Sequence, residues 1–102
     1  MTFGYNGSMR TKPGHRDEVL AILLSGSEGL RAAGCHLYVV GVSDTDDQTI
    51  WVNEVWESRE HHAASLQLPA TRAAIAAAMP MLTGEFTSQE FTVRGGLGVP
   101  AV

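Results

Sequence analysis

The sequence predicts an α+β fold in which four strands and two helices follow one another in the order β-α-β-β-α-β. Four segments either alternate apolar and polar residues or are rich in Val and aromatic residues, as strands are. Two other segments carry apolar or Ala residues at helical spacing. The length of 102 residues, with 44% hydrophobic and 18% charged residues, fits one globular domain.

The N-terminal half predicts a strand and a long helix. Phe3, Tyr5 and Met9 alternate with polar residues, which predicts a strand over about Thr2–Arg10. A Lys-Pro-Gly sequence at residues 12–14 ends it. We expect a helix over His15–Ala33, because its apolar residues, together with a Gly at position 26, recur at helical spacing.

The rest of the chain predicts a hairpin, an interrupted helix and a last strand. The second and third strands are expected over Cys35–Ser43 and Thr49–Glu57, joined by a polar connection. The next helix begins with Ser58 as its N-cap and is interrupted at Pro69, whose ring removes a backbone donor. The remaining elements are the resumed helix, about Ala70–Met79, and a fourth strand, about Gly84–Arg94.

This order of elements is the ferredoxin-like arrangement, in which four antiparallel strands carry both helices on one face. Residues 1–94 then form a single domain, and residues 95–102 form a tail that is flexible or contacts a partner. The chain has no spare element to cover the other face of the sheet. A second copy of the chain is therefore expected there, which predicts a homodimer.

Composition excludes several classes of function. The net charge is −4 and the basic residues are scattered, so we expect no nucleic-acid binding. No apolar run approaches the roughly 20 residues of a membrane span, and the N-terminus lacks the pattern of a secretory signal. The single cysteine, Cys35, has no partner for an internal disulfide, so we expect a buried structural thiol and a cytoplasmic protein.

The candidate site lies where the third strand runs into the second helix. Strand parity places Glu54 and Trp56 on one face of the sheet, and the helix brings His61 and His62 past its end. Polar groups gathered at such a junction predict a pocket for a small molecule, although a strand-end Trp is also common in a core. The two histidines are about 100° apart on the helix, so only one can enter the pocket, and no metal-binding spacing is present.

The pattern Glu54-x-Trp56-x-Ser58, followed by His62, Ser65 and Leu66 and later by Met-Pro-Met-Leu at residues 79–82, resembles the antibiotic biosynthesis monooxygenase domain family. The resemblance covers residues 2–94 and implies a homodimer whose two sheets meet as a dimeric α+β barrel. Each subunit would hold a pocket between its sheet and helices.

The resemblance also implies a choice of functions. Some members of the family are cofactor-independent oxygenases that oxidise anthrones or hydroquinones to quinones with dioxygen, so we expect a small electron-rich aromatic substrate, dioxygen and no cofactor or metal. A dimer that binds a small aromatic without turnover is the alternative. Related proteins degrade heme, but they usually carry a late-helix His that is missing from residues 70–79.

Six site residues are expected. The resemblance suggests three of them, with an exposed strand amide as the alternative for Asn6 and a structural hydrogen bond as the alternative for His62, and the other three follow from their places on the strands and helices. The expected catalytic residues are Trp56, whose N–H suits an oxygen or peroxide, Asn6, whose amide could hold an oxyanion, and His62 as a base. The other three are expected to bind substrate, with structural alternatives for each: Tyr38 as a polar tip or a half-buried sheet residue, Glu54 as a buried acid or one half of an ion pair, and Arg72 as its partner or as an anion ligand.

Overall fold

The predicted sheet is confirmed by the structure, a computed structural model that describes residues 1–100. Its four strands are all antiparallel to their neighbours and lie in the order β2-β3-β1-β4. The candidate site residues of the sheet lie on three neighbouring strands, β2, β3 and β1. The strand bounds are β1 Phe3–Thr11, β2 Cys35–Val42, β3 Thr49–Trp56 and β4 Leu82–Thr92.

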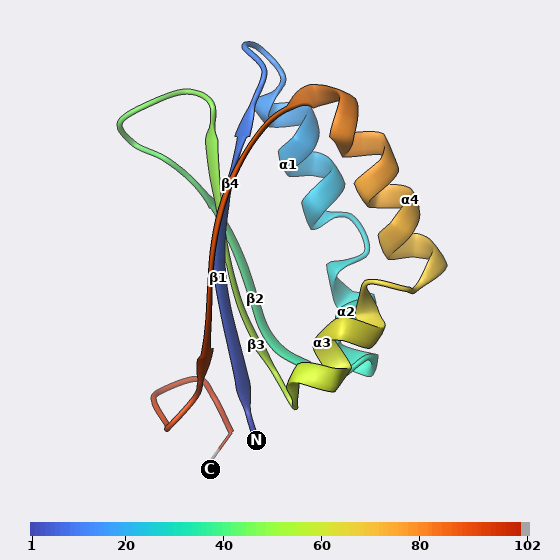
Figure 1. Cartoon of the computed structure of the whole chain (residues 1–102), viewed down its shortest axis with the longest axis vertical. Coiled ribbons are helices and arrows are strands. Elements are labelled where there is room, and N and C mark those ends of the chain that lie inside the picture. The colour runs from blue at the N-terminus through green and yellow to red at the C-terminus, as the bar shows by residue number, and fades with distance from the viewer. Residues whose placement is uncertain (101–102) are drawn as a thin grey trace.

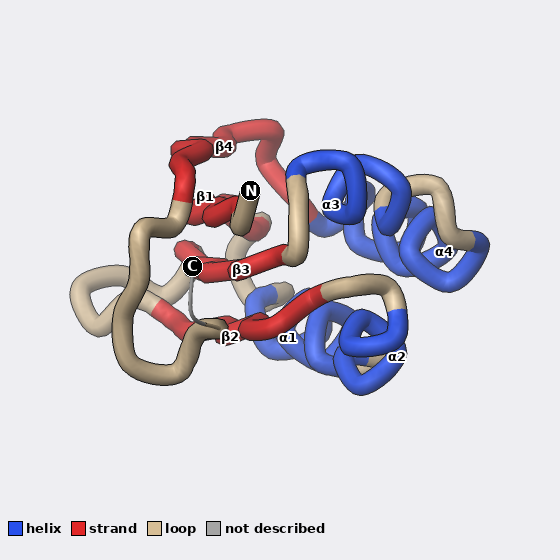
Figure 2. The backbone as a smooth tube through the Cα atoms, turned by 90° about the horizontal axis from the view of Figure 1, so that it is seen from below, coloured by secondary structure: helices blue, strands red, loops and turns tan. Residues whose placement is uncertain are grey.

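All helices cover one face of this sheet (Figures 1 and 2). Seen end-on in Figure 2, the strands form one layer and the helices a second layer beside it. None of the helices in residues 1–100 is long and apolar enough to cross a membrane. The helix bounds are α1 Arg16–Leu24, α2 Ser27–Ala32, α3 Arg59–Ser65 and α4 Pro69–Ala78, followed by a 3-10 turn, η1, Met79–Met81.

The first helix differs from the prediction of one continuous helix over His15–Ala33. It breaks between α1 and α2 at residues 25–26, where Gly26 adopts the left-handed backbone conformation with φ 72°. Glycine enters that region without the steric cost that other residues meet. The Gly that fitted the apolar stripe is therefore the residue that ends the first helix and turns the chain into the second.

The second predicted helix is confirmed with its interruption. Ser58 caps α3, because its hydroxyl accepts a hydrogen bond from the His61 amide at 3.1 Å. Pro69 stands in the first turn of α4, where a missing N–H costs nothing. The last strand, β4, begins earlier than predicted, because Leu82 already pairs with Thr11 of β1.

The core lies between the sheet and the helices in two clusters. Ile50 and Val52 of β3 pack with Val19 of α1 and Ala78 of α4. The second cluster is Phe3, Cys35 and Trp56 at the other end of the sheet. Cys35 is buried as predicted, its thiol donates to the Leu37 carbonyl at 3.2 Å, and burial raises the pKa of the thiol to about 11.

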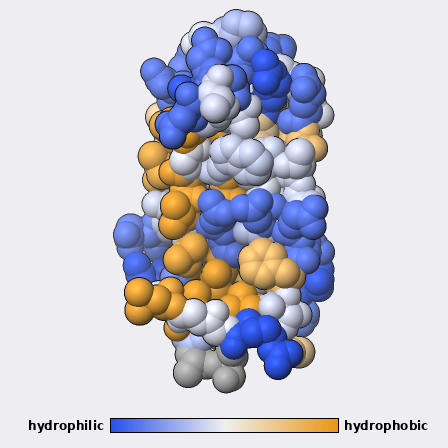
Figure 3. All heavy atoms as spheres, turned by 90° about the vertical axis from the view of Figure 1, so that its left-hand side faces the viewer, coloured by the Kyte–Doolittle hydropathy of each residue, from blue (hydrophilic) through white to orange (hydrophobic). Residues whose placement is uncertain are grey.

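The opposite face of the sheet has no helix over it. Figure 3 shows this face with apolar groups along one side and polar groups across it. Its large exposed hydrophobic side chains are Val39, Trp51 and Phe91, with 51%, 42% and 48% of their surface accessible. The chain leaves the sheet after Thr92. That residues 95–102 form a flexible or partner-contacting tail stays a prediction, and residues 101–102 lie outside the described residues.

Candidate functional site

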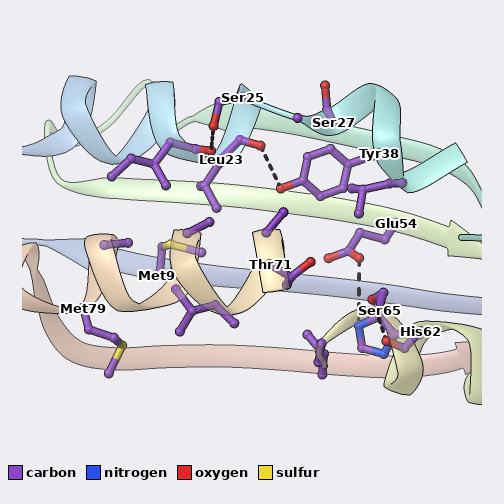
Figure 4. Close-up of a pocket in the computed structure, with 18 of the residues that line it drawn as sticks. Met9, Leu23, Ser25, Ser27, Tyr38, Glu54, His62, Ser65, Thr71 and Met79 are labelled. Atoms are coloured by element: carbon purple, nitrogen blue, oxygen red, sulfur yellow. Dashed lines mark hydrogen bonds and ion pairs between the residues drawn. The ribbon is translucent and has the colours of Figure 1, made fainter. Parts of the chain in front are cut away.

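A cavity of about 300 Å³ lies between the inner face of the sheet and the helix layer. Most of its wall is apolar and comes from α1, α2, α4 and β4, with Met9 and Met79 at one end (Figure 4). The polar side chains Tyr38, Glu54, His62 and Ser65 gather at the other end. The cavity is thus mainly apolar, with hydroxyls of Ser25, Ser27 and Thr71 along its helix side and its ionisable groups at one end, as expected for a site that orients a largely apolar molecule.

Glu54 is the centre of the polar end. The strand register places it directly between Tyr38 on β2 and Tyr5 on β1, with all three side chains on the helix-covered face. The indole N–H of Trp56 donates to Glu54 Oε1 at 2.8 Å, and His62 Nε2 lies 3.9 Å from the same oxygen. The Glu54 side chain is only 12% exposed and that of His62 13%, so this arrangement is largely withdrawn from water.

Burial favours the uncharged forms of both Glu54 and His62. Burial raises the pKa of Glu54 above its ordinary value of 4.5, and the Trp56 hydrogen bond opposes that rise only in part. Burial also lowers the pKa of His62 below 6.5, although the Glu90 carboxylate opposes this. Burial therefore favours the uncharged imidazole of His62, and Glu54 takes up a proton more readily than an exposed glutamate does.

Aromatic packing fixes the His62 ring over the end of the sheet. The ring centroids of Phe3, Tyr5 and Trp56 all lie between 5.2 and 5.5 Å from that of His62. The Tyr5 ring is stacked on it with an interplanar angle of 28°. His62 is thus held by its neighbours rather than free to rotate, which favours a defined role beside Glu54.

Tyr38 lines the cavity, in agreement with its predicted position. Its hydroxyl donates to the Leu23 carbonyl at 3.3 Å, and burial raises its pKa to about 12. The phenol therefore stays protonated at neutral pH. With its proton directed to the backbone, its oxygen faces the cavity mainly as a hydrogen-bond acceptor.

Two predicted residues lie outside this cavity, which corrects their expected placement. Asn6 sits on the opposite face of the sheet, where its amide donates to the Asn53 side chain. Arg72 is exposed on α4 and is absent from the cavity wall, and no ion pair among residues 1–100 joins it to Glu54. Asn6 lies on the opposite face because side chains alternate along a strand, and Phe3, Tyr5 and Met9 occupy the inner face.

Trp56 is in the predicted place but is engaged differently. Its side chain is almost fully buried, at 1% exposure, and its only N–H is already used by Glu54. The indole therefore positions the carboxylate instead of presenting a free donor to a bound oxygen. The pairing of Glu54 with Trp56, two residues apart on one strand face, replaces the predicted pairing of Glu54 with Arg72.

Tyr5 and Gly7 were not among the predicted site residues. Both lie on the inner face of β1, and a side chain at Gly7 would come within 2.9 Å of the Tyr5 ring and hydroxyl. With Ser88 they border a second hollow of about 230 Å³ that also shares Tyr38 and Glu54 with the main cavity. The alternation of Tyr5 with Asn6 in the sequence was the signal that could have identified them.

The described side chains at the polar end form no metal-binding cluster. Within residues 1–100, no three His, Cys, Asp or Glu side chains come close enough together to hold a metal ion. The other histidine of α3, His61, faces away from the cavity and bonds through Nδ1 to the Ser58 hydroxyl at 2.6 Å. The helix geometry predicted this separation of the two adjacent histidines.

Comparison with known proteins identifies relatives over nearly the whole chain. The family described as antibiotic biosynthesis monooxygenase matches residues 2–77. A Chloroflexus aurantiacus protein named for these enzymes is 39% identical, with 98% of this chain and 100% of that one covered and a TM-score of 0.87. No curated protein matches the chain.

More distant solved structures show the same fold. A Caulobacter crescentus protein, also named for these monooxygenases, is 20% identical with a TM-score of 0.82, covering 90% of this chain and 89% of its own. A Nitrosomonas europaea protein with a similar name is 13% identical with a TM-score of 0.84, covering 99% of this chain and 94% of its own. At such identities the likeness concerns the fold and not the reaction.

Proposed function

The chain belongs to the antibiotic biosynthesis monooxygenase family, and from this premise we propose that it oxidises a small electron-rich aromatic, such as an anthrone or hydroquinone, to a quinone with dioxygen and without a cofactor. One observation carries the proposal: a buried carboxylate, Glu54, stands at the polar end of an apolar cavity with a neutral imidazole beside it. A reaction that begins with proton removal requires such a proton acceptor.

The first step is removal of a proton from the substrate. Glu54 accepts it from an acidic C–H or O–H of the aromatic, and the raised pKa of this carboxyl makes it a better acceptor than an exposed glutamate. Trp56 holds the carboxylate in position through its N–H. The apolar wall limits the access of water to Glu54 and His62, which favours exchange of the proton among these groups and the substrate.

The second step transfers electrons from the substrate anion to dioxygen. For a ring carbon that begins as CH₂, a C–O bond forms and gives a peroxide, which takes up a proton returned by Glu54 or His62. The O–O bond then breaks as the carbon loses its second hydrogen, so that the carbon becomes a carbonyl and one oxygen atom leaves as water. One substrate and one dioxygen thus give one quinone and one water.

We also propose that the protein is a homodimer, as the family resemblance implies. The sheet face that carries Val39, Trp51 and Phe91 has no cover within the described chain, and it lies opposite the cavity. Two such faces packed together would bury these side chains while leaving both cavities open. The non-catalytic alternative keeps the same dimer and the same cavity but uses no dioxygen.

Oxygen uptake by chelator-treated protein, with a panel of anthrones and hydroquinones, tests the proposal. We expect turnover without added cofactor and a fall of at least about tenfold in Trp56→Phe, because that variant releases the Glu54 carboxylate. Trp51→Phe is the matched control, since the same substitution on the outer face of β3 leaves the cavity intact.

Three results would decide between the alternatives. Uptake that stays at the rate of uncatalysed autoxidation, while the same aromatics bind, would favour the non-catalytic binding protein. Uptake that depends on added heme would favour heme degradation. Equal uptake by Trp56→Phe and Trp51→Phe would place the reaction away from Glu54.

A further inference from the structure

The cavity wall carries no fixed positive charge. Among the described residues that line it, none is Lys or Arg, and the only ionisable side chains are Tyr38, Glu54 and His62. Of these, only Glu54 can carry a negative charge near neutral pH, because burial raises the pKa of Tyr38 to about 12 and an imidazole such as His62 has no anionic form at that pH. A bound molecule therefore meets one buried negative charge and nothing that compensates a second one.

The nearby arginines are occupied or face solvent. Arg59 pairs with Glu90 and lies over the Phe3 ring, 4.6 Å from its centroid. Arg72 is exposed on α4, away from the wall. A carboxylate brought into the cavity would thus lose its hydration, gain no ion pair and be repelled by Glu54.

Several donors at the polar end are already used, while the ring N–H of His62 and the hydroxyl of Thr71 form no hydrogen bond within residues 1–100. The Trp56 N–H is used by Glu54, the Tyr38 hydroxyl donates to the Leu23 carbonyl, and the Ser65 hydroxyl donates to the His62 carbonyl at 2.6 Å. Glu54, in contrast, keeps a free acceptor. Within residues 1–100, both side-chain contacts to its carboxylate go to Oε1, which leaves Oε2 without a protein partner.

We propose that the cavity selects an uncharged aromatic of few rings with a phenolic hydroxyl that donates to Glu54 Oε2, and that it rejects aromatics that carry a carboxylate. The volume of about 300 Å³ lies at the lower end of the roughly 300–1,000 Å³ that ligand pockets occupy. The apolar walls of α1 and α4 hold the rings, and the hydroxyl donates to Glu54 Oε2, which has no side-chain partner within residues 1–100.

This selection deepens the proposed function, because the hydroxyl bonded to Glu54 is the group that loses its proton. It can be tested without turnover. Calorimetric titration at about pH 8, well above the ordinary pKa values of glutamate and histidine, compares three probes: a naphthol, its methyl ether and the corresponding hydroxynaphthoate. We expect the naphthol to bind at least about tenfold more tightly than either of the others.

Binding of the same probes to three variants tests the expected selection a second time. Glu54→Gln replaces the free acceptor by an amide N–H₂, so naphthol affinity should fall while hydroxynaphthoate affinity rises. Thr71→Lys adds a cation to the wall near Glu54 and should raise affinity for the hydroxynaphthoate alone. Ala73→Lys adds the same charge to the exposed side of α4 and should change neither value.

The proposal fails if the wild-type protein binds the hydroxynaphthoate or the methyl ether as tightly as the naphthol, or does not bind the naphthol at all. It also fails if Thr71→Lys and Ala73→Lys have equal effects on hydroxynaphthoate binding. Because these titrations need no dioxygen chemistry, selective binding without oxygen uptake would leave the selection standing and overturn only the proposed reaction.

Discussion

At the scale of single residues, the site depends on a carboxylate placed where its charge is costly. Glu54 is buried beside aromatic rings, and its hydrogen bond from Trp56 offsets only part of the cost. A protein selected for stability alone would not retain such a charge, so a functional reason is expected. The buried charge should therefore affect stability as well as activity.

Glu54→Gln should raise the melting temperature near neutral pH. Because the folded-state pKa of Glu54 is raised, its contribution to stability is fully present below the ordinary value of 4.5 and is lost as the pH rises through the folded-state pKa. Glutamine accepts the same Trp56 hydrogen bond without a charge, so the gain should shrink as the pH falls toward 4.5.

Thermal unfolding followed at several pH values checks this prediction. Glu85→Gln, at an exposed position of β4, is the control and should leave the melting temperature almost unchanged throughout. A lower melting temperature of Glu54→Gln at neutral pH would show that the ionised carboxylate stabilises the fold, contrary to the account.

The residue patterns predicted part of this site. Parity placed Glu54 and Trp56 on one face, and helix geometry separated His61 from His62. The hydrogen bond from Trp56 to Glu54 could not be predicted, because it depends on side-chain torsions and not on spacing. Asn6 lies outside the cavity because strand alternation puts its side chain on the face opposite that of Tyr5, and a resemblance in residue type does not determine which face a side chain takes.

At the scale of secondary structure, the break between α1 and α2 shapes the wall of the cavity. Residues 25–27 line the cavity at this break, and Gly26 makes it possible through its positive φ. The strands and the α3–α4 interruption were predictable, since Pro69 and Ser58 are strong local signals. The break at Gly26 was missed because a glycine within an apolar stripe also fits close helix packing.

Gly26→Ala should lower the free energy of unfolding by about 1–2 kcal/mol, because alanine must adopt the left-handed conformation there. Gly29→Ala is a matched control within α2. Neither position has atoms near an added Cβ, but Gly29 has helical geometry, so alanine should stabilise the protein by about 0.5–1 kcal/mol. Urea unfolding measures both, and a stabilising Gly26→Ala would contradict the role given to this glycine.

At the scale of the whole molecule, the two faces of the sheet serve different purposes. The inner face carries the core and the cavity, and the outer face presents exposed apolar side chains (Figure 3). The order of elements predicted the helices on one face, because hydrophobic patterning and connection lengths determine it. Homodimerisation remains a prediction, since it depends on how two outer faces fit together and a single chain does not contain that information.

Trp51→Glu should shift the protein from twice the chain mass to the chain mass in light scattering coupled to gel filtration. The substitution places a charge at the centre of the outer face, where burial in a dimer would be costly. Gln67→Glu adds the same charge on the helix side and should leave the mass unchanged. A wild-type protein that is monomeric at all concentrations would overturn this part of the account.

The most direct test of the central claim is the pH profile of kcat/KM for oxygen uptake in wild type and Glu54→Gln. The account predicts that the wild-type rate rises with pH as Glu54 ionises, with a midpoint above 4.5, and that the glutamine variant is slower by about a hundredfold or more and lacks this rise. A glutamine variant within about threefold of wild type at every pH would contradict the claim that Glu54 accepts the substrate proton.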